Sequence, residues 1–363
     1  MKISVPDYIL SIKAYPPGKP LEALEREYGI DNSIKLASNE NPLGPSPLAL
    51  QAIETAMKKL HRYPDGSGHD PIKKISEKIG VAPHNIVLGN GSDEIIAMLV
   101  RALLQPGDEA ILPRPSFLIY EIMVRSVGAV PVYVPLKRLS IDLPGIENRI
   151  TSRTRMVFIC NPNNPTGTVV SKKEFNEFLN SIPPGIIVVV DEAYIEFVRD
   201  PNCLYSMDYQ DDNRPLVTLR TFSKVYGLAG LRIGYGVMPK ELSELLNRIR
   251  LPFNANSLAQ VAAAAALDDT MFLHKTIHLV HEGLDFLYDC MERLGLEYFP
   301  SQANFFLINV KRDADEIFEN MLRKGVIVRS MTSYGYPEYI RINVGLPVEN
   351  VRFVKALSEV IQS

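Results

Sequence analysis

The sequence predicts an α/β fold in which a mostly parallel sheet lies between helices, followed by a smaller α+β domain. Two observations lead to this prediction. From about residue 86 to residue 250, short apolar runs alternate with helical periods, an order that is typical of βαβ units. The run IIVVV at 186–190 is apolar at every position, which indicates a strand covered on both faces, as in a parallel sheet between helices.

The first 253 residues are expected to form an arm and a large domain. Residues 1–35 carry four prolines within their first 20 positions, so we expect an extended arm there, because proline interrupts helices. The large domain is expected over 36–253, with a short strand ending at residue 89. Its other expected strands are 109–113, 130–136, 155–162, 185–194, 215–222 and 232–238. Its expected helices are 93–104, 116–129, 172–182 and 240–250.

The pattern changes after residue 253. An alanine-rich helical stretch is expected over 257–294, with one break near Asp268 and Asp269. Shorter strand and helix patterns then alternate as far as the C-terminus. We therefore expect a small α+β domain over 254–363.

Composition argues against several classes of protein. The chain has 363 residues, a net charge of −3 and 46% hydrophobic residues, which suits a soluble globular protein and not one that binds nucleic acid or anionic membranes broadly. No apolar run reaches membrane-spanning length, and the N-terminus lacks the apolar core of a signal peptide. The three cysteines show no metal-binding spacing. We therefore expect a cytoplasmic protein with reduced thiols, no metal, and neither nucleic acid nor membrane as a partner.

The sequence predicts neither a histidine metal site nor a catalytic serine. His274, His278 and His281 share one face of a predicted helix, at a spacing that could hold a metal ion. No HExxH accompanies them, and we favour an ordinary helix surface. A GxSxG motif is also absent, so the sequence does not predict a serine hydrolase.

Three segments place polar residues where an open α/β sheet binds ligands, beyond the carboxyl ends of its strands. The first is GNGSDEII at 89–96, a glycine-rich turn before a predicted helix. Ser92 and Asp93 fall at the start of that helix, where free backbone N–H groups favour an anion. Ordinary N-capping explains the same residues, and on this segment alone we favour capping.

The second and third segments follow predicted strands directly. In CNPNNPTG at 160–167 three asparagines supply neutral donors, and we expect the turn to aim Asn164 back at the strand ends. Asp191 follows five apolar residues, where a carboxylate is costly without a partner. That partner could be the cationic ring nitrogen of a cofactor, or Asp191 could cap the next turn. A magnesium-binding strand of an ATPase requires GxxxxGK[ST] upstream, which is absent.

Lys224 lies in TFSK, after the apolar run of a predicted strand, and the next charge along the chain is Arg232. Partial burial and a nearby cation both lower the pKa of a lysine, because each disfavours the ammonium form. A lysine that is partly neutral is a nucleophile toward carbonyl groups. A solvated surface lysine is the alternative, but Thr221, Ser223 and the neighbouring glycines suggest close packing or anion contacts.

These motifs together resemble a known family. NPNNPTG, VVVDEAY and TFSKVYGLAGLRIGY, in this order and spacing, resemble the pyridoxal-phosphate-dependent aminotransferases of fold type I. LASNENPLGPSP, RYPDGSG, GNGSDEII and YIRINVG narrow the resemblance to the histidinol-phosphate aminotransferases, over nearly the whole chain. The resemblance implies a cytoplasmic homodimer that moves an amino group between L-histidinol phosphate and 2-oxoglutarate in L-histidine biosynthesis, giving imidazole acetol phosphate and L-glutamate.

The resemblance also implies a role for each matching residue. Lys224 would form a Schiff base with the aldehyde of pyridoxal 5'-phosphate and move the proton between Cα and C4′. Asp191 would keep the ring nitrogen protonated so that the ring accepts electrons. Asn164 and Tyr194 would bind the phenolic oxygen of the ring, and Phe117 would stack on it. The residues implied around the cofactor phosphate are Ser92, Asp93, Thr221, Ser223, Arg232 and, from the other subunit, Tyr63.

The implied substrate site consists of Tyr15, Asn39, Arg329 and Arg341. Two arginines suit an enzyme that must bind a phosphate ester in one half-reaction and a dicarboxylate in the other, because guanidinium groups accept both. Two enzymes of the same fold remain alternatives. A threonine-phosphate decarboxylase would release carbon dioxide without a keto acid, and an aromatic-amino-acid aminotransferase would prefer phenylalanine as donor. A nucleotide-binding or regulatory protein of this fold would be expected to lack Lys224 or Asp191, and both are present.

Overall fold

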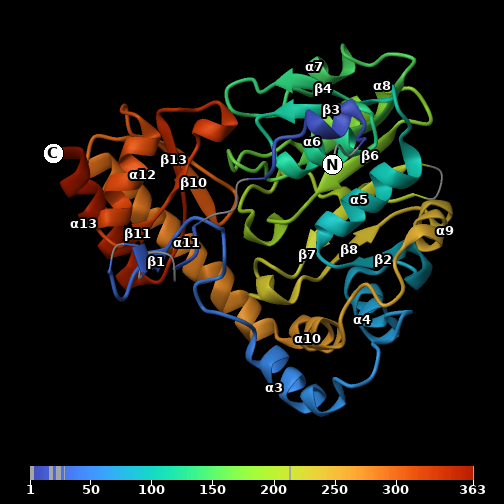
Figure 1. Cartoon of the computed structure of the whole chain (residues 1–363), viewed down its shortest axis with the longest axis horizontal. Helices are drawn as coiled ribbons and strands as arrows, with labels where there is room; N and C mark the ends of the chain where they lie inside the picture. The colour runs from blue at the N-terminus through green and yellow to red at the C-terminus, as the bar shows by residue number, and fades with distance from the viewer. Residues whose placement is uncertain (1–3, 16–18, 22–25, 28, 212–213, 363) are drawn as a thin grey trace.

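A seven-stranded sheet, here called the central sheet, lies in the right-hand part of the molecule as drawn in Figure 1. The computed structural model describes residues 4–15, 19–21, 26–27, 29–211 and 214–362. The strands of the central sheet, in the order in which they lie side by side, are β2 (Ile86–Gly89), β8 (Gly234–Val237), β7 (Leu216–Thr221), β6 (Ile187–Asp191), β5 (Thr154–Cys160), β3 (Glu109–Arg114) and β4 (Val130–Pro135).

The central sheet is mostly parallel, as the sequence predicts. Among its described strands only β8 runs against its neighbours, pairing antiparallel with both β2 and β7. The other pairings, from β7 through to β4, are parallel. Every residue of β6 and β7 is buried, and burial on both faces explains why β6 is apolar at each position from Ile187 to Val190. The predicted α/β fold class is thus confirmed.

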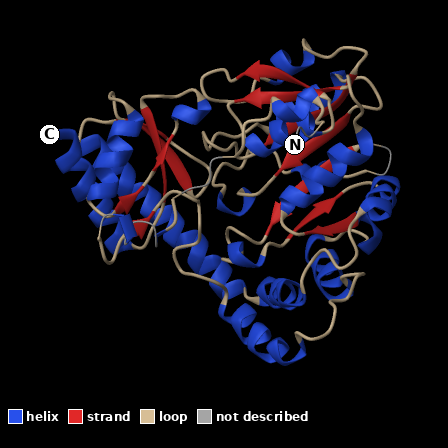
Figure 2. Ribbon diagram, in the orientation of Figure 1, coloured by secondary structure: helices blue, strands red, loops and turns tan. Residues whose placement is uncertain are grey.

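Helices cover both faces of this sheet (Figure 2). The four expected helices are present as α5 (Ser92–Leu103), α6 (Leu118–Ser126), α8 (Lys172–Ser181) and α9 (Lys240–Ile249). Successive residues of β6 face opposite cores, because side chains alternate along a strand. Val189 packs in the core that includes residues of α5 and α6, whereas Val188 and Val190 pack in the core that includes Phe175 and Phe178 of α8.

Among the described residues of the first half of the chain, four helices were not expected from the sequence. They are α1 (Asp7–Leu10), α3 (Pro47–Ala56), α4 (His69–Ile79) and α7 (Leu143–Glu147). The prediction that the arm is extended is wrong for α1, which packs against α6. Proline does not prevent this helix, because Pro6 is its N-cap residue, before the hydrogen-bonded turns begin. Residues 16–18, also part of the predicted arm, lie outside the described residues.

The helical stretch expected over 257–294 divides as predicted, into α10 (Ser257–Asp268) and α11 (Thr270–Arg293). Asp269 lies at the break and caps α11, because its side chain accepts a hydrogen bond from the backbone N–H of Phe272. The other oxygen of Asp269 accepts from Ser46 Oγ at 2.6 Å. Asp269 therefore also holds Ser46, the residue just before α3, in place.

A second, four-stranded antiparallel sheet follows. Its strands, in spatial order, are β12 (Arg329–Ser330), β13 (Tyr339–Asn343), β10 (Phe305–Asn309) and β9 (Glu297–Phe299). The helices α12 (Ala314–Arg323) and α13 (Pro347–Gln362) complete this part of the chain. The short strand β1 (Ile34–Lys35) pairs in parallel with β11 (Val326–Ile327), so the end of the arm joins the C-terminal region.

The domain boundaries expected at residues 35 and 253 remain predictions. Two elements bear on where they would fall. β1 precedes the first boundary and pairs with the C-terminal β11. α10 follows the second boundary and packs against α3 and α4 of the expected large domain.

The segment after β1 lies closely over the loop that contains Lys224. Asn41 Nδ2 donates to the carbonyl oxygen of Val225 at 2.9 Å, and the Ser46 backbone N–H donates to that of Tyr226. A Cβ atom at Gly227, where φ is +70°, would lie 2.0 Å from the carbonyl oxygen of Gly44. Only glycine allows this approach.

We therefore expect Gly227→Ala to lower the free energy of unfolding by about 3 kcal/mol, because the added methyl group meets backbone in a left-handed conformation. Urea denaturation measures the change. The matched control is Gly230→Ala, where an added Cβ meets no atom within 4 Å. Equal stability of the two variants would contradict the role given to this close approach.

Candidate active site

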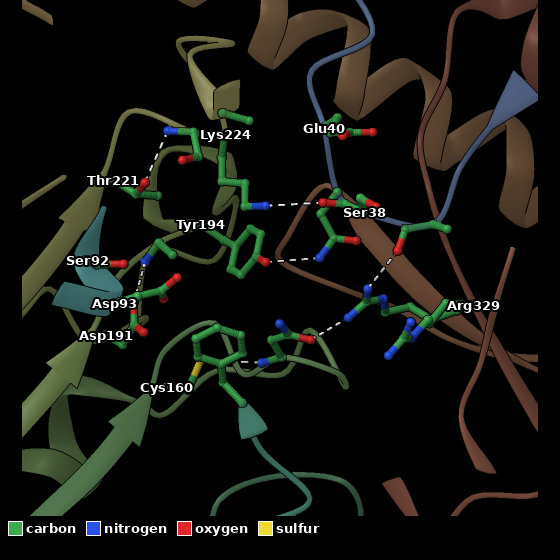
Figure 3. A pocket seen from close by; sticks show the side chains of 18 of the residues that line it. Ser38, Glu40, Ser92, Asp93, Cys160, Asp191, Tyr194, Thr221, Lys224 and Arg329 are labelled. Carbon is green, nitrogen blue, oxygen red and sulfur yellow. Dashed lines mark hydrogen bonds between the residues drawn. The ribbon is translucent and has the colours of Figure 1, made fainter. Parts of the chain in front are cut away.

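A cavity of about 270 Å³ lies at the carboxyl ends of the central strands (Figure 3). Cys160, Asp191 and Thr221, the last residues of β5, β6 and β7, all line it, in agreement with the general position of ligand sites in open α/β sheets. Every predicted site residue except Tyr63 lines this cavity: Tyr15, Asn39, Ser92, Asp93, Phe117, Asn164, Asp191, Tyr194, Thr221, Ser223, Lys224, Arg232, Arg329 and Arg341.

Asp191 forms part of the cavity wall with both carboxylate oxygens held. Tyr120 donates its hydroxyl to Oδ2 at 2.6 Å, and the backbone N–H of Ala193 donates to Oδ1 at 3.2 Å. The side chain is 3% exposed. Burial raises the pKa of Asp191 to about 6, although the hydrogen bond from Tyr120 acts in the opposite direction. A cationic group in the cavity would relieve this cost, so the site suits a protonated ring nitrogen.

Lys224 reaches the same cavity from the loop after β7. Its Nζ donates to the carbonyl oxygen of Ser38 at 3.2 Å and lies 5.6 Å from the centre of the Tyr194 ring. Burial, together with the charge of Arg341, lowers the pKa of Lys224 to about 8. Arg232, the cation next to Lys224 in sequence, has a smaller effect in the same direction. A substantial fraction of this amine is therefore neutral near pH 8.

One end of the cavity is suited to a phosphate group. Helix α5 begins at Ser92 after Gly91, with no side chain capping its first N–H groups, so the capping that we favoured for Ser92 and Asp93 is not formed. Arg232 Nη2 lies 3.3 Å from Asp93 Oδ2, and its Nη1 lies 3.4 Å from Ser223 Oγ. Backbone N–H groups, hydroxyls and a guanidinium thus converge as they do in anion sites. Gly91 has a φ of +81°, a conformation that favours glycine, and a Cβ there would meet Arg232 Nη2 at 2.6 Å.

Arg341 of β13 forms the opposite side of the cavity. It is 6% exposed, and its two terminal nitrogens donate to Asn164 Oδ1 and to the carbonyl oxygen of Ala37. Asn39 Nδ2 donates to the Tyr194 hydroxyl at 2.9 Å. Within the described residues, Arg341 Nε and Asn39 Oδ1 are buried without a hydrogen-bond partner. Unpartnered buried polar atoms are rare, and these two indicate that a polar ligand completes the site.

Tyr63 lies apart from the cavity. Its ring is 82% exposed and stacks on Phe253 at 4.7 Å between ring centres. Both residues line a second hollow, together with Leu60 and Leu258. A contact between Tyr63 and a cofactor phosphate would therefore have to be made in another subunit, as the resemblance implies.

Comparisons with known proteins agree with the motifs. The family model for aminotransferase class I and II matches residues 31–357. The chain belongs to this aminotransferase family. It is similar to the histidinol-phosphate aminotransferase of Desulfotalea psychrophila, with 48% identity over 100% of this chain and 96% of that protein. It is 46% identical to that of Moorella thermoacetica, over 97% of this chain and 92% of the relative.

Solved structures of aminotransferases have the same fold. The crystal structure of Sinorhizobium meliloti histidinol-phosphate aminotransferase, in complex with pyridoxal-5'-phosphate, superposes with a TM-score of 0.90. It shares 28% identity and covers 98% of this chain and 96% of its own. Thermus thermophilus aspartate aminotransferase with maleate gives a TM-score of 0.86 at 22% identity, over 99% of this chain and all of that one. The fold is therefore that of fold type I aminotransferases.

Several residues of this aminotransferase site were missed from the sequence. Ser38, Glu40, Cys160 and Tyr334 also line the cavity, and Tyr120 lies behind Asp191. Ser38 and Glu40 flank Asn39 in the motif ASNENP. Their place beside a predicted site residue could have identified them from the sequence. Nothing in the sequence signals Tyr334, which reaches the cavity from a short 3₁₀ turn at Thr332–Tyr334.

Two of the three histidines on α11 lie close to oxygen atoms of the protein. His278 Nε2 lies 3.1 Å from Glu282 Oε1, and His281 Nε2 lies 2.8 Å from the carbonyl oxygen of Phe197. In the part of the chain that the structure describes, no group of three or more His, Cys, Asp or Glu side chains could hold a metal ion. Within the same residues, none of the helices combines the length and apolar character needed to cross a membrane.

We expect Lys224→Met to stabilise the cofactor-free protein near pH 7 by about 2 kcal/mol, because it removes a buried charge. The gain should shrink as pH rises. The folded protein loses the Lys224 proton near pH 8, whereas the unfolded chain keeps it to about pH 10.5, so the stability of the unsubstituted protein increases between these two pKa values. Urea denaturation at a series of pH values measures the difference. A gain that is independent of pH up to 10.5 would contradict the lowered pKa.

Proposed function

We propose that this chain binds pyridoxal 5'-phosphate in the cavity and moves the amino group between L-histidinol phosphate and 2-oxoglutarate, in the cytoplasm, as a step of L-histidine biosynthesis. One observation carries the proposal. A single cavity brings together a lysine of lowered pKa, a buried carboxylate and two separate cationic ends, contributed by Arg232 and by Arg341. A transaminase that uses this cofactor and two anionic substrates needs this combination.

The cofactor fits the residues present. When bound, pyridoxal 5'-phosphate supplies a ring that accepts the electrons left when a proton is removed next to the substrate amine. Asp191 would hold the proton on the ring nitrogen, and that cation would offset the cost of burying the carboxylate. The start of α5, Ser223 and Arg232 would hold the phosphate. Asn164 and Tyr194 would bind the phenolic oxygen.

Lys224 would hold the cofactor and also move protons. Its pKa of about 8 leaves part of the amine neutral at physiological pH, so that Nζ can attack a carbonyl carbon. With the cofactor bound, Lys224 Nζ would also accept the proton from the carbon next to the substrate amine and would return it in the second part of the transfer. A general base works best when its pKa lies near the working pH, and burial in this cavity moves the pKa of Lys224 toward that value.

The substrate anion would bind on the side of Arg341. The phosphate of histidinol phosphate and the distal carboxylate of 2-oxoglutarate both suit a guanidinium group. Arg341 Nε is buried without a partner among the described residues, so a ligand acceptor there would satisfy it. Arg329 and Tyr15 line the same cavity and would complete the anion site, and the free Asn39 Oδ1 would accept a donor from the substrate.

We also propose a homodimer with shared active sites. Exposed apolar side chains occur in the two segments that line the hollow around Tyr63 or flank it in sequence, and a surface of this kind is often an interface. They include Met57, Leu60, Leu251 and Phe253, which are between 44% and 63% exposed. Tyr63 would then reach the cofactor phosphate of the partner subunit.

Borohydride reduction of the cofactor-loaded protein, followed by peptide mass analysis, is expected to place a pyridoxyl group on Lys224. Lys224→Ala should give no such adduct and should lower transamination by at least about 10³-fold, because the proton-transfer group is lost. An adduct on another lysine of the unsubstituted protein would overturn the site assignment.

Comparison of amino donors distinguishes this activity from the two alternative activities of the same fold. Histidinol phosphate with 2-oxoglutarate should give the highest kcat/KM. A higher value with phenylalanine would indicate an aromatic-amino-acid aminotransferase. Release of carbon dioxide from threonine phosphate without a keto acid would indicate a decarboxylase.

Hybrid dimers test the shared site. Tyr63→Ala and Lys224→Ala chains, co-expressed with different tags and isolated as a hybrid, should recover about half of the unsubstituted activity, because one of the two sites then carries neither change. The matched control is a hybrid of Asp191→Ala and Lys224→Ala. Since both residues line the cavity of one chain, each site of that hybrid carries a defect and should stay inactive. Inactivity of the Tyr63→Ala hybrid would place Tyr63 outside the partner's site.

A further inference from the structure

Tyr120 lies behind the cavity wall, where its hydroxyl reaches Asp191. It lies in the first turn of α6, is 1% exposed, and does not line the cavity itself. Its hydroxyl donates to Asp191 Oδ2 at 2.6 Å. The other carboxylate oxygen accepts from the backbone N–H of Ala193. Each oxygen of Asp191 thus has its own donor, and the side-chain donor comes from an element far away in the sequence.

We propose that Tyr120 is a positioning residue for transamination: its hydroxyl fixes the orientation of the Asp191 carboxylate and favours its ionised form. The inference rests on the proposed function, in which Asp191 is the partner of the cofactor ring nitrogen. A protonated or rotated carboxyl group at position 191 would not keep that nitrogen cationic, and the ring would then accept electrons less well.

Packing holds the Tyr120 ring independently of its hydroxyl. The ring stacks on Phe158 of β5, with 4.7 Å between centres and an angle of 16° between planes. It also meets the edge of Phe117, with 5.5 Å between centres. A phenylalanine at position 120 would keep both contacts, so Tyr120→Phe removes the hydroxyl and leaves the aromatic packing in place.

The charges around Asp191 show why this hydroxyl matters. Asp93 at the start of α5 and Glu192 next to Asp191 both raise the pKa of the carboxyl group, and burial raises it most. The Cys160 thiol at the end of β5 and the phenol of Tyr194 are neutral, because burial raises the pKa of each. The hydrogen bonds from Tyr120 and from the Ala193 N–H are what lower the pKa of Asp191. Removing the hydroxyl leaves only the backbone donor.

An infrared titration of the cofactor-free protein tests this directly. The carboxyl band of protonated Asp191 is identified by its absence from Asp191→Asn. Its intensity should fall to half near pH 6 in the unsubstituted protein. In Tyr120→Phe we expect this midpoint to rise by about one pH unit, because the ionised form loses a charge-assisted hydrogen bond.

Turnover of the cofactor-loaded protein supplies a second readout. Tyr120→Phe should lower kcat by about tenfold and leave the KM for the amino donor within about twofold, because the substrate anion site is untouched. The pH midpoint of the visible absorbance of the bound cofactor should also rise. A purely structural role for Tyr120 would lower the melting temperature without moving either midpoint.

Two controls keep the outcome clear. Tyr288→Phe also removes a hydrogen-bonded hydroxyl from a stacked ring, since Tyr288 accepts from the Ser301 N–H and stacks on Tyr298, but it lies outside the cavity and should leave the Asp191 midpoint unchanged. If Tyr120→Phe does not fold, Tyr120→3-fluorotyrosine, a stronger donor of similar size, should lower the midpoint. An unchanged midpoint in a folded variant overturns the proposal.

The two proposals fail separately. If Lys224 is not trapped by borohydride but the Asp191 midpoint moves, the Tyr120 contact acts as described and the proposed aminotransferase function is wrong. If Lys224 is trapped and the midpoint does not move, the aminotransferase function stands and Tyr120 has no part in setting the ionisation of Asp191.

Discussion

The candidate active site depends on the burial of two ionisable groups at one edge of the central sheet. Water is largely excluded around Asp191 and Lys224, and this exclusion shifts both pKa values toward neutrality, upward for the acid and downward for the amine. Neither group is fixed in one protonation state at physiological pH. Each can therefore respond to a ligand that brings a charge or accepts a proton, which groups held at their ordinary pKa values would do less readily.

The fold creates this environment by bringing three distant parts of the chain together. The carboxyl ends of β5, β6 and β7 supply Cys160, Asp191 and Thr221. The segment after β1 lies over the lysine loop and supplies Ser38 and Asn39, while the antiparallel sheet supplies Arg329 and Arg341. Glycine makes part of this closeness possible, since a side chain at Gly227 would meet the backbone of Gly44. The site is thus a property of the tertiary structure and not of any one motif.

Much of this arrangement was predictable from the sequence. The features that were missed have no unambiguous local pattern. The apolar run before Asp191 identified a strand buried on both faces, and the ordered motifs identified most of the residues around the cavity. Helix α4 was missed although Ile72, Ile75 and Ile79 recur at helical spacing, because Gly66, Gly68 and Pro71 around its start are typical of a loop. Tyr120 was missed because a tyrosine three residues after Phe117 looks like part of a helix core. Only the folded chain brings it to Asp191, 71 residues further on.

The tethering of Arg341 has a consequence for how anions are recognised. Both terminal nitrogens of this side chain are already held, by Asn164 and by the carbonyl oxygen of Ala37. A long flexible side chain normally loses rotational freedom when it captures a ligand, and that loss weakens the complex. In this protein the Arg341 side chain loses its rotational freedom during folding, when the two sheets come together. An arriving anion therefore meets a preorganised cation, and the loss of side-chain entropy belongs to folding rather than to association.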